Sequence, residues 1–206
     1  MGERLVFIGD SITDCDRRLD GRGLGFGYVD VVADELAARG VDAVVLNRGI
    51  AGNRVADLRD RWQREVLDER PDVITVFVGV NDTLWTFYEG RPTPPEEFER
   101  DLEDILARTG DARLIVVDPF ILAVPGEQFR WGEGTVFTRE DLDLKRPIVR
   151  DLAARHGASF VPLQDAMSAV AAERGNVVVA GDGVHPTALG HRLLARLWLL
   201  AYDEGR

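Results

Sequence analysis

Short apolar runs alternate along this chain with longer amphipathic stretches. The apolar runs are rich in β-branched residues and read as continuous rather than alternating, which is typical of parallel strands buried on both faces. The stretches between them carry apolar residues at helical spacing. The pattern predicts strands over residues 5–9, 43–47, 73–79, 113–118 and 159–162.

Glycine and proline mark the ends of the predicted helices. Gly40 and Gly157 directly follow two of them, as expected of helix C-terminal glycines. The last predicted helix has Pro186 at its first position. It carries an apolar stripe for packing on the sheet, formed by Leu189, Leu193, Leu194, Leu197 and Leu200. The predicted helices span residues 28–39, 55–68, 95–108, 139–156 and 186–202.

Strict alternation of strand and helix predicts one doubly wound domain over residues 1–206, a three-layer α/β/α sandwich. Ligands of such folds bind beyond the carboxyl ends of the strands. The chemistry is therefore expected in the loops 9–11, 48–54, 79–85 and 181–186, and after residue 118. The longest irregular stretch, 119–138, is predicted to be a functional or mobile loop.

Composition narrows the class of partner. The formal net charge of −11 and the scattered basic residues disfavour nucleic acid and anionic membranes. We find no apolar run long enough to cross a bilayer and no signal-peptide pattern, which favours a cytoplasmic protein. The single cysteine, Cys15, can form no intramolecular disulfide.

Ser11 is the serine best placed for chemistry. It follows the first predicted strand directly, whereas Ser159 begins a strand and Ser168 lies in a helical segment. The surrounding 10–14 segment also suits a helix N-cap. Capping and catalysis are compatible, because a helix N-terminus favours a developing oxyanion.

His185 is the candidate base among three histidines. His156 ends a predicted helix and His191 lies inside one, so both suit structural roles. Asp182 stands three residues before His185 and can accept its Nδ1–H, which would fix the tautomer and stabilise the imidazolium. The alternative is a turn with an incidental histidine.

Two further loops offer hydrogen-bond donors for an oxyanion. Gly52 follows the second strand, where a glycine lets the backbone approach a ligand. Asn81 follows the third strand and carries a neutral amide. Each loop alone reads as an ordinary turn. Together, the four loops supply a nucleophile, two donors and an Asp–His pair at one sheet edge.

These residues resemble the four blocks of the SGNH hydrolase (GDSL esterase/lipase) superfamily, in the family's order. The resemblance implies a flavodoxin-like, five-stranded parallel sheet and a serine ester hydrolase with neither metal nor organic cofactor. It assigns Ser11 as nucleophile, His185 as base and Asp182 as its partner. It also assigns the oxyanion hole to Ser11, Gly52 and Asn81.

A narrower resemblance covers residues 7–15, 27–29 and 49–62, which look like intracellular acetylxylan esterases. It implies an acetyl esterase acting on small acetylated xylo-oligosaccharides, and a homo-oligomer. The chain has Gly181 where that group has a tryptophan, which puts the sugar in doubt. Trp85 and Trp131 could compensate for the lost aromatic surface. The candidate substrate-binding residues are Asp10, Asn53, Trp85 and Trp131.

Other functions compete with this one. A dinucleotide-binding enzyme is disfavoured, because the glycines at 21, 23, 25 and 27 neither fit G-x-G-x-x-G nor follow the first strand closely. A non-catalytic carbohydrate-binding protein would need no Asp–His pair. A lysophospholipase, a thioesterase and a broad short-chain carboxylesterase of the same fold remain open.

Overall fold

A computed structural model describes residues 2–91, 93–124 and 139–205, with only the backbone described at 86–89. Five parallel strands form its single described sheet, in the order β2-β1-β3-β4-β5. This is the flavodoxin-like order, as expected. The strands are β1 (Glu3–Gly9), β2 (Ala43–Gly49), β3 (Val73–Phe77), β4 (Arg113–Val117) and β5 (Ser159–Val161).

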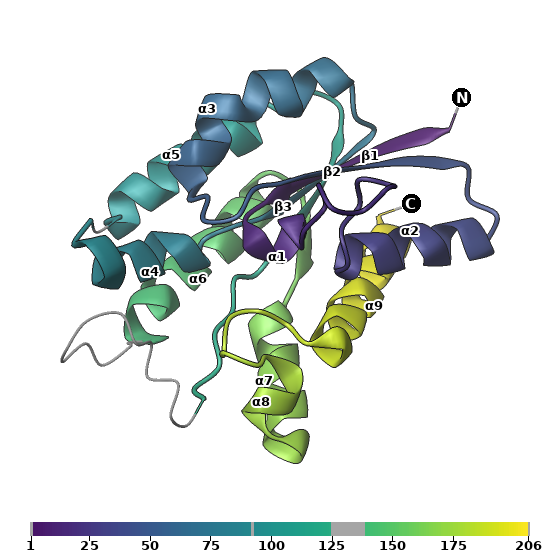
Figure 1. Ribbon diagram of the computed structural model, residues 1–206. Coiled ribbons are helices and arrows are strands. Elements are labelled where there is room, and N and C mark those ends of the chain that lie inside the picture. Colours follow the sequence, from purple (N-terminus) through teal and green to yellow (C-terminus); the bar gives the residue numbers. More distant parts are fainter. Residues whose placement is uncertain (1, 92, 125–138, 206) are drawn as a thin grey trace.

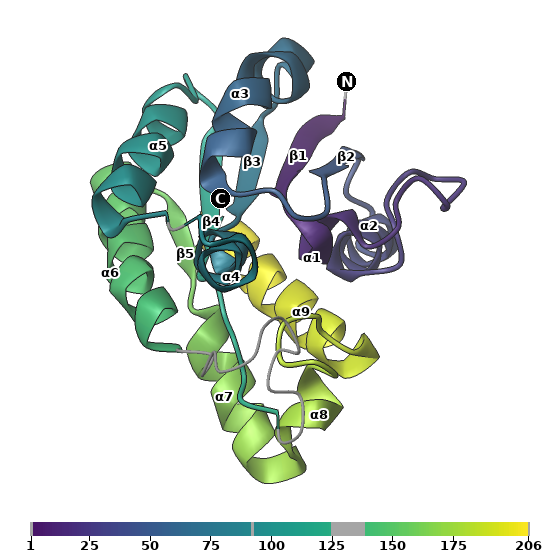
Figure 2. The ribbon, with the colours of Figure 1, turned by 60° about the vertical axis from the view of Figure 1, so that its left-hand side comes forward.

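Helices cover both faces of the sheet, which confirms the predicted three-layer sandwich. In Figure 1, α3 (Val55–Glu65) and α5 (Pro95–Ala107) lie above the sheet, and α2 (Tyr28–Ala38) and α9 (Ala188–Glu204) lie below it. Figure 2 shows α6 (Arg139–Arg155) beside α5, and its buried residues join the core beneath α3 and α5. The remaining described helices are α1 (Ser11–Asp14), η1 (Leu67–Glu69), α4 (Val80–Glu89), α7 (Leu163–Arg174) and α8 (Asn176–Val179).

Alternate residues of the strands feed two apolar cores. Leu5 and Phe7 of β1 point to the face of α2 and α9, where they pack with Tyr28 and Trp198. Val6 and Ile8 point to the opposite face, covered by α3, α5 and α6. Burial on both sides explains why the strands read as continuous apolar runs.

The end of the chain differs from the prediction in two respects. The last helix does not begin at Pro186: Thr187 is its N-cap and accepts a hydrogen bond from Gly190 N. Pro186 instead forms an isolated antiparallel bridge with Ala180. Leu200 of the predicted apolar stripe is 53% exposed, because the buried face of the helix runs along Leu194, Trp198 and Tyr202 instead.

Two other helices depart from expectation. The predicted helix 55–68 ends at Glu65 and continues as the short 3-10 turn η1. The segment after β3 is not a loop, since α4 starts at Val80, directly after Gly79. Gly79 allows this abrupt start with a φ of 128°. None of the helices in the described part is both long and apolar enough to span a lipid bilayer.

Candidate active site

Three predicted residues meet at the carboxyl edge of the sheet. Ser11 is the first residue of α1, which follows β1 directly. Its Oγ lies 2.9 Å from His185 Nε2, although the two residues are 174 positions apart. His185 Nδ1 lies 2.6 Å from Asp182 Oδ2. The structure thus brings the predicted serine, histidine and aspartate into one hydrogen-bonded chain.

The loop around Asp182 is built to orient the imidazole. Asp182 Oδ1 accepts the backbone N–H groups of Val184 at 2.9 Å and of His185 at 2.7 Å. Gly183 has a φ of 87°, and a Cβ atom there would lie 2.2 Å from Leu122 O. A side chain at position 183 would therefore displace the segment that packs against the loop.

The electrostatics of the pair favour a basic imidazole. Burial tends to raise the pKa of Asp182, but the His185 ring and two backbone N–H groups outweigh it and lower that pKa to about 2. The hydrogen bond to Asp182 raises the pKa of His185 above its ordinary value, against the opposing effect of burial. An ionised Asp182 holds a proton on His185 Nδ1 and leaves Nε2 free to take one from Ser11.

Three candidate hydrogen-bond donors follow the carboxyl ends of the neighbouring strands β1, β2 and β3. Neither Ser11 N–H nor Gly52 N–H has an acceptor among the described residues. Gly52 has a φ of 81°. The Asn81 amide at the start of α4 donates one hydrogen to Asn53 O at 3.1 Å and retains a second. Donors of this kind can stabilise a negative charge that develops on a carbonyl oxygen.

The candidate substrate-binding residues fall into different places. Asp10 is fully buried and caps α1 by accepting Ile12 N–H at 3.0 Å, so its side chain has no surface for a substrate. Asn53 uses its side-chain oxygen to accept a bond from Arg61. Trp85 is partly exposed and donates its indole N–H to Gly52 O at 3.1 Å. Trp131 lies outside the described residues.

Sequence reasoning missed the residues that hold these loops. Arg61 is only 6% exposed and donates to Gly9 O, Arg48 O and Asn53 Oδ1, joining the ends of β1 and β2 to the Gly52 loop. The available signal was its place on the apolar face of α3, next to Trp62. A buried guanidinium requires several acceptors.

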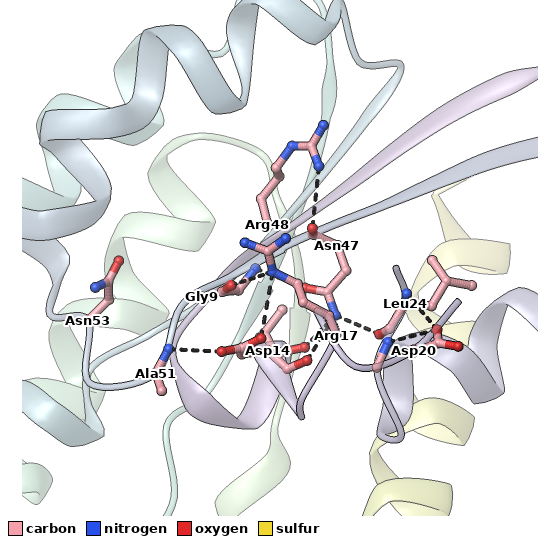
Figure 3. Close-up of polar contacts among 12 residues, drawn as sticks. Gly9, Asp14, Arg17, Asp20, Leu24, Asn47, Arg48, Ala51 and Asn53 are labelled. Carbon is pink, nitrogen blue, oxygen red and sulfur yellow. Dashed lines mark hydrogen bonds and ion pairs between the residues drawn. The ribbon is translucent and has the colours of Figure 1, made fainter. Parts of the chain in front are cut away.

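A second network ties α1 to the same loop. Figure 3 shows Asp14 Oδ2 accepting Ala51 N–H at 3.2 Å, and Asn47 donating to Leu24 O at 2.7 Å. Asn47 also donates to Thr13 O at 2.6 Å. The helix that carries Ser11 is therefore joined to the loop that carries Gly52 through Asp14, and to β2 through the buried amide of Asn47.

Cys15 and His191 pack beside α1. Cys15 Sγ lies 3.7 Å from His191 Nε2, and His191 Nδ1 accepts Tyr28 N–H at 3.1 Å. Burial lowers the pKa of His191 to about 4 and raises the pKa of the Cys15 thiol. A neutral histidine beside a protonated thiol serves packing rather than nucleophilic chemistry.

Residues 7–193 match the GDSL-like Lipase/Acylhydrolase family. The chain belongs to this family. It is a carboxylic ester hydrolase, as the combination of loops predicts. The SGNH-type fold and the family resemblance are thereby confirmed.

Known proteins similar to this chain include esterases. The acetylxylan esterase of Geobacillus stearothermophilus is 34% identical, with 96% of this chain and 93% of that protein covered. Its crystal structure has a TM-score of 0.84 at 32% identity, covering 97% and 94% of the two chains. LAE5, an α/β hydrolase enzyme from the metagenome of Lake Arreo in Spain, has a TM-score of 0.85 at 30% identity, covering 98% and 95%.

Proposed function

We propose that this enzyme is a serine acetyl esterase that deacetylates small acetylated oligosaccharides through an acyl-enzyme. The observation that carries the proposal is the continuous chain from Ser11 Oγ to His185 at 2.9 Å and on to Asp182 at 2.6 Å. Such a chain activates a hydroxyl that is otherwise a weak nucleophile at neutral pH.

In the first half-reaction, Ser11 Oγ attacks the carbonyl carbon of the ester and gives its proton to His185 Nε2. The electron pair of the carbonyl moves onto its oxygen, which Ser11 N–H, Gly52 N–H and the Asn81 amide stabilise. The imidazolium is held by the carboxylate of Asp182. His185 then protonates the alcohol oxygen of the sugar, the C–O bond breaks, and the acetyl group stays on Ser11.

In the second half-reaction, water takes the place of the alcohol. The water oxygen attacks the acetyl-serine carbonyl while His185 accepts a proton from the water. The same donors stabilise the second oxyanion. Collapse of the intermediate returns the proton to Ser11 Oγ and releases acetate. In support of these roles, serine-to-alanine and histidine-to-alanine variants of the Geobacillus esterase are described as catalytic mutants.

The acetylated sugar is supported by two observations. One relative that is 34% identical over nearly the whole chain, the Geobacillus stearothermophilus protein, is an acetylxylan esterase. The net charge of −11 disfavours docking on anionic lipid surfaces. A cytoplasmic location and a homo-oligomer stay predictions.

The deciding experiment compares kcat/KM for p-nitrophenyl acetate, butyrate and octanoate with acetate release from peracetylated xylobiose. We expect a preference for acetate and release of acetate from the sugar. Ser11→Ala should lose covalent labelling by a phosphonate ester and lower kcat by several orders of magnitude. Preference for octanoate with no acetate from the sugar would favour a lipase or thioesterase. Full activity of the Ser11→Ala protein would refute the mechanism in which Ser11 is the nucleophile.

A further inference from the structure

Trp85 lies against the loop that carries one of the oxyanion donors. Its indole N–H donates to Gly52 O at 3.1 Å. A Cβ atom built on Gly52 would lie 3.7 Å from the edge of the indole ring. The guanidinium of Arg54 stands over that ring, 5.5 Å from its centroid. The ring is therefore fixed between its own helix, α4, and the loop that follows β2.

Three side chains from the first turns of α4 form hydrogen bonds to backbone groups in or next to this loop. Trp85 binds Gly52 O, the Asn81 amide binds Asn53 O at 3.1 Å, and Asp82 accepts Val55 N–H at 3.1 Å. Positions 81, 82 and 85 share one side of a helix at this spacing. One short helix thus carries the Asn81 donor and also sets the place of the Gly52 donor.

The peptide unit between Gly52 and Asn53 is bonded at both of its ends. Its carbonyl accepts from Trp85, and its N–H donates to Ile50 O at 3.2 Å. On the other side of Gly52, Asp14 holds Ala51 N–H. A glycine turns easily about its own torsions. These bonds hold the peptide units on both sides of the Ala51–Gly52 peptide, so they limit the directions that Gly52 N–H can take.

We infer that Trp85 is a positioning residue, whose indole N–H fixes the Gly52–Asn53 peptide so that Gly52 N–H faces the reacting carbonyl oxygen. The inference rests on the proposed acyl-enzyme function. It differs from a role for Trp85 as a stacking surface for sugar, because a hydrogen bond to the backbone acts on any acetyl ester, with or without a sugar.

The test is Trp85→Phe, which keeps an aromatic ring beside Arg54 and removes the N–H group. We expect kcat to fall about 3- to 30-fold on p-nitrophenyl acetate and on peracetylated xylobiose alike, with KM within about twofold. This loss is smaller than the about 10²–10³-fold expected when an oxyanion donor itself is removed. The rate of phosphonylation of Ser11 should fall by the same factor, because that reaction uses the same donors.

Trp62→Phe is the matched control. The indole N–H of Trp62 is buried in α3 and has no hydrogen-bond partner in the described part of the chain. The same substitution there breaks no described hydrogen bond and should leave kcat and KM unchanged. If Trp85→Phe impairs folding, benzothienylalanine at the same position keeps the bicyclic shape and removes only the donor.

Two results would overturn the inference. An unchanged kcat with a raised KM for the sugar alone would assign Trp85 to sugar binding. Equal loss of activity in the Trp85→Phe and Trp62→Phe proteins would assign the effect to general packing. If Ser11→Ala is inactive, either result counts against the inference alone, whereas an active Ser11→Ala protein rejects the proposed function with it.

Discussion

Asp10 makes the stability of this enzyme depend on pH in a direction opposite to that of a paired carboxylate. Its side chain is fully buried, Oδ1 accepts Ile12 N–H at 3.0 Å, and Oδ2 has no partner among the described residues. Burial raises the pKa of Asp10 from 3.8 to about 7, although the bond to Ile12 N–H and the charge of His185 oppose the change.

The direction in which stability changes with pH follows from the number of protons that the folded and unfolded states bind. Between pH 3.8 and about 7 the folded protein keeps a proton on Asp10 that the unfolded chain releases, so the free energy of unfolding falls as the pH rises. Each pH unit in this window corresponds to about 1.4 kcal/mol. When the pH rises from 5 to 8.5, only the two units below about 7 contribute, so the free energy of unfolding falls by about 3 kcal/mol.

Asp10→Asn removes the ionisation and keeps an oxygen to cap α1. We measure the free energy of unfolding by urea titration at pH 5 and at pH 8.5. The decrease between the two pH values should be about 3 kcal/mol smaller in the variant than in the wild type. Asp60→Asn, on a side chain that is 75% exposed, is the matched control and should keep the wild-type dependence. The same pH dependence in Asp10→Asn and wild type would show that Asp10 is not a buried, protonated acid.

Three other substitutions test the site. Asn81→Ala should lower kcat by about 10²–10³-fold with little change in KM, because the amide acts on the oxyanion; a change in KM alone would mean that Asn81 binds the ground state. Asp182→Asn should lower kcat by about 10⁴-fold. Because Asp182 raises the pKa of His185, the acid limb of kcat/KM should also move to lower pH, and an unmoved limb would contradict the pairing. Cys15→Ala should keep kcat within about twofold, and a folded but inactive variant would refute its packing role.

The periodic parts of the chain were the most predictable. All five strands were located to within two residues, because strands buried on both faces leave an unbroken apolar signal. Ser11 was found because it alone of three serines directly follows a predicted strand, and His185 because Asp182 stands three residues before it. Their meeting over 174 positions follows from the sheet order, which no local pattern contains.

The helix α4 was missed for a physical reason. It starts without a polar N-cap, directly behind Gly79, and its stability comes from tertiary packing. Val80 and Leu84 are buried with Ile121 and Val184, from segments distant in sequence. Local capping and propensity rules give no weight to such contacts. The start of the last helix was misplaced for a different reason. Pro186 at the first helical position and Thr187 as N-cap were equally compatible with the sequence, and the structure has Thr187 as the N-cap.

The distance in sequence between Ser11 and His185 also implies that the active site forms late during folding. The hydroxyl and the imidazole join segments that lie 174 positions apart, and the loop with His185 is anchored by contacts of α9 with α2 and β5. Contacts of such long range form slowly, because the entropy of closing a long loop must be overcome first. Recovery of ester hydrolysis during refolding should therefore trail the recovery of helical signal, so that activity reports the completed fold.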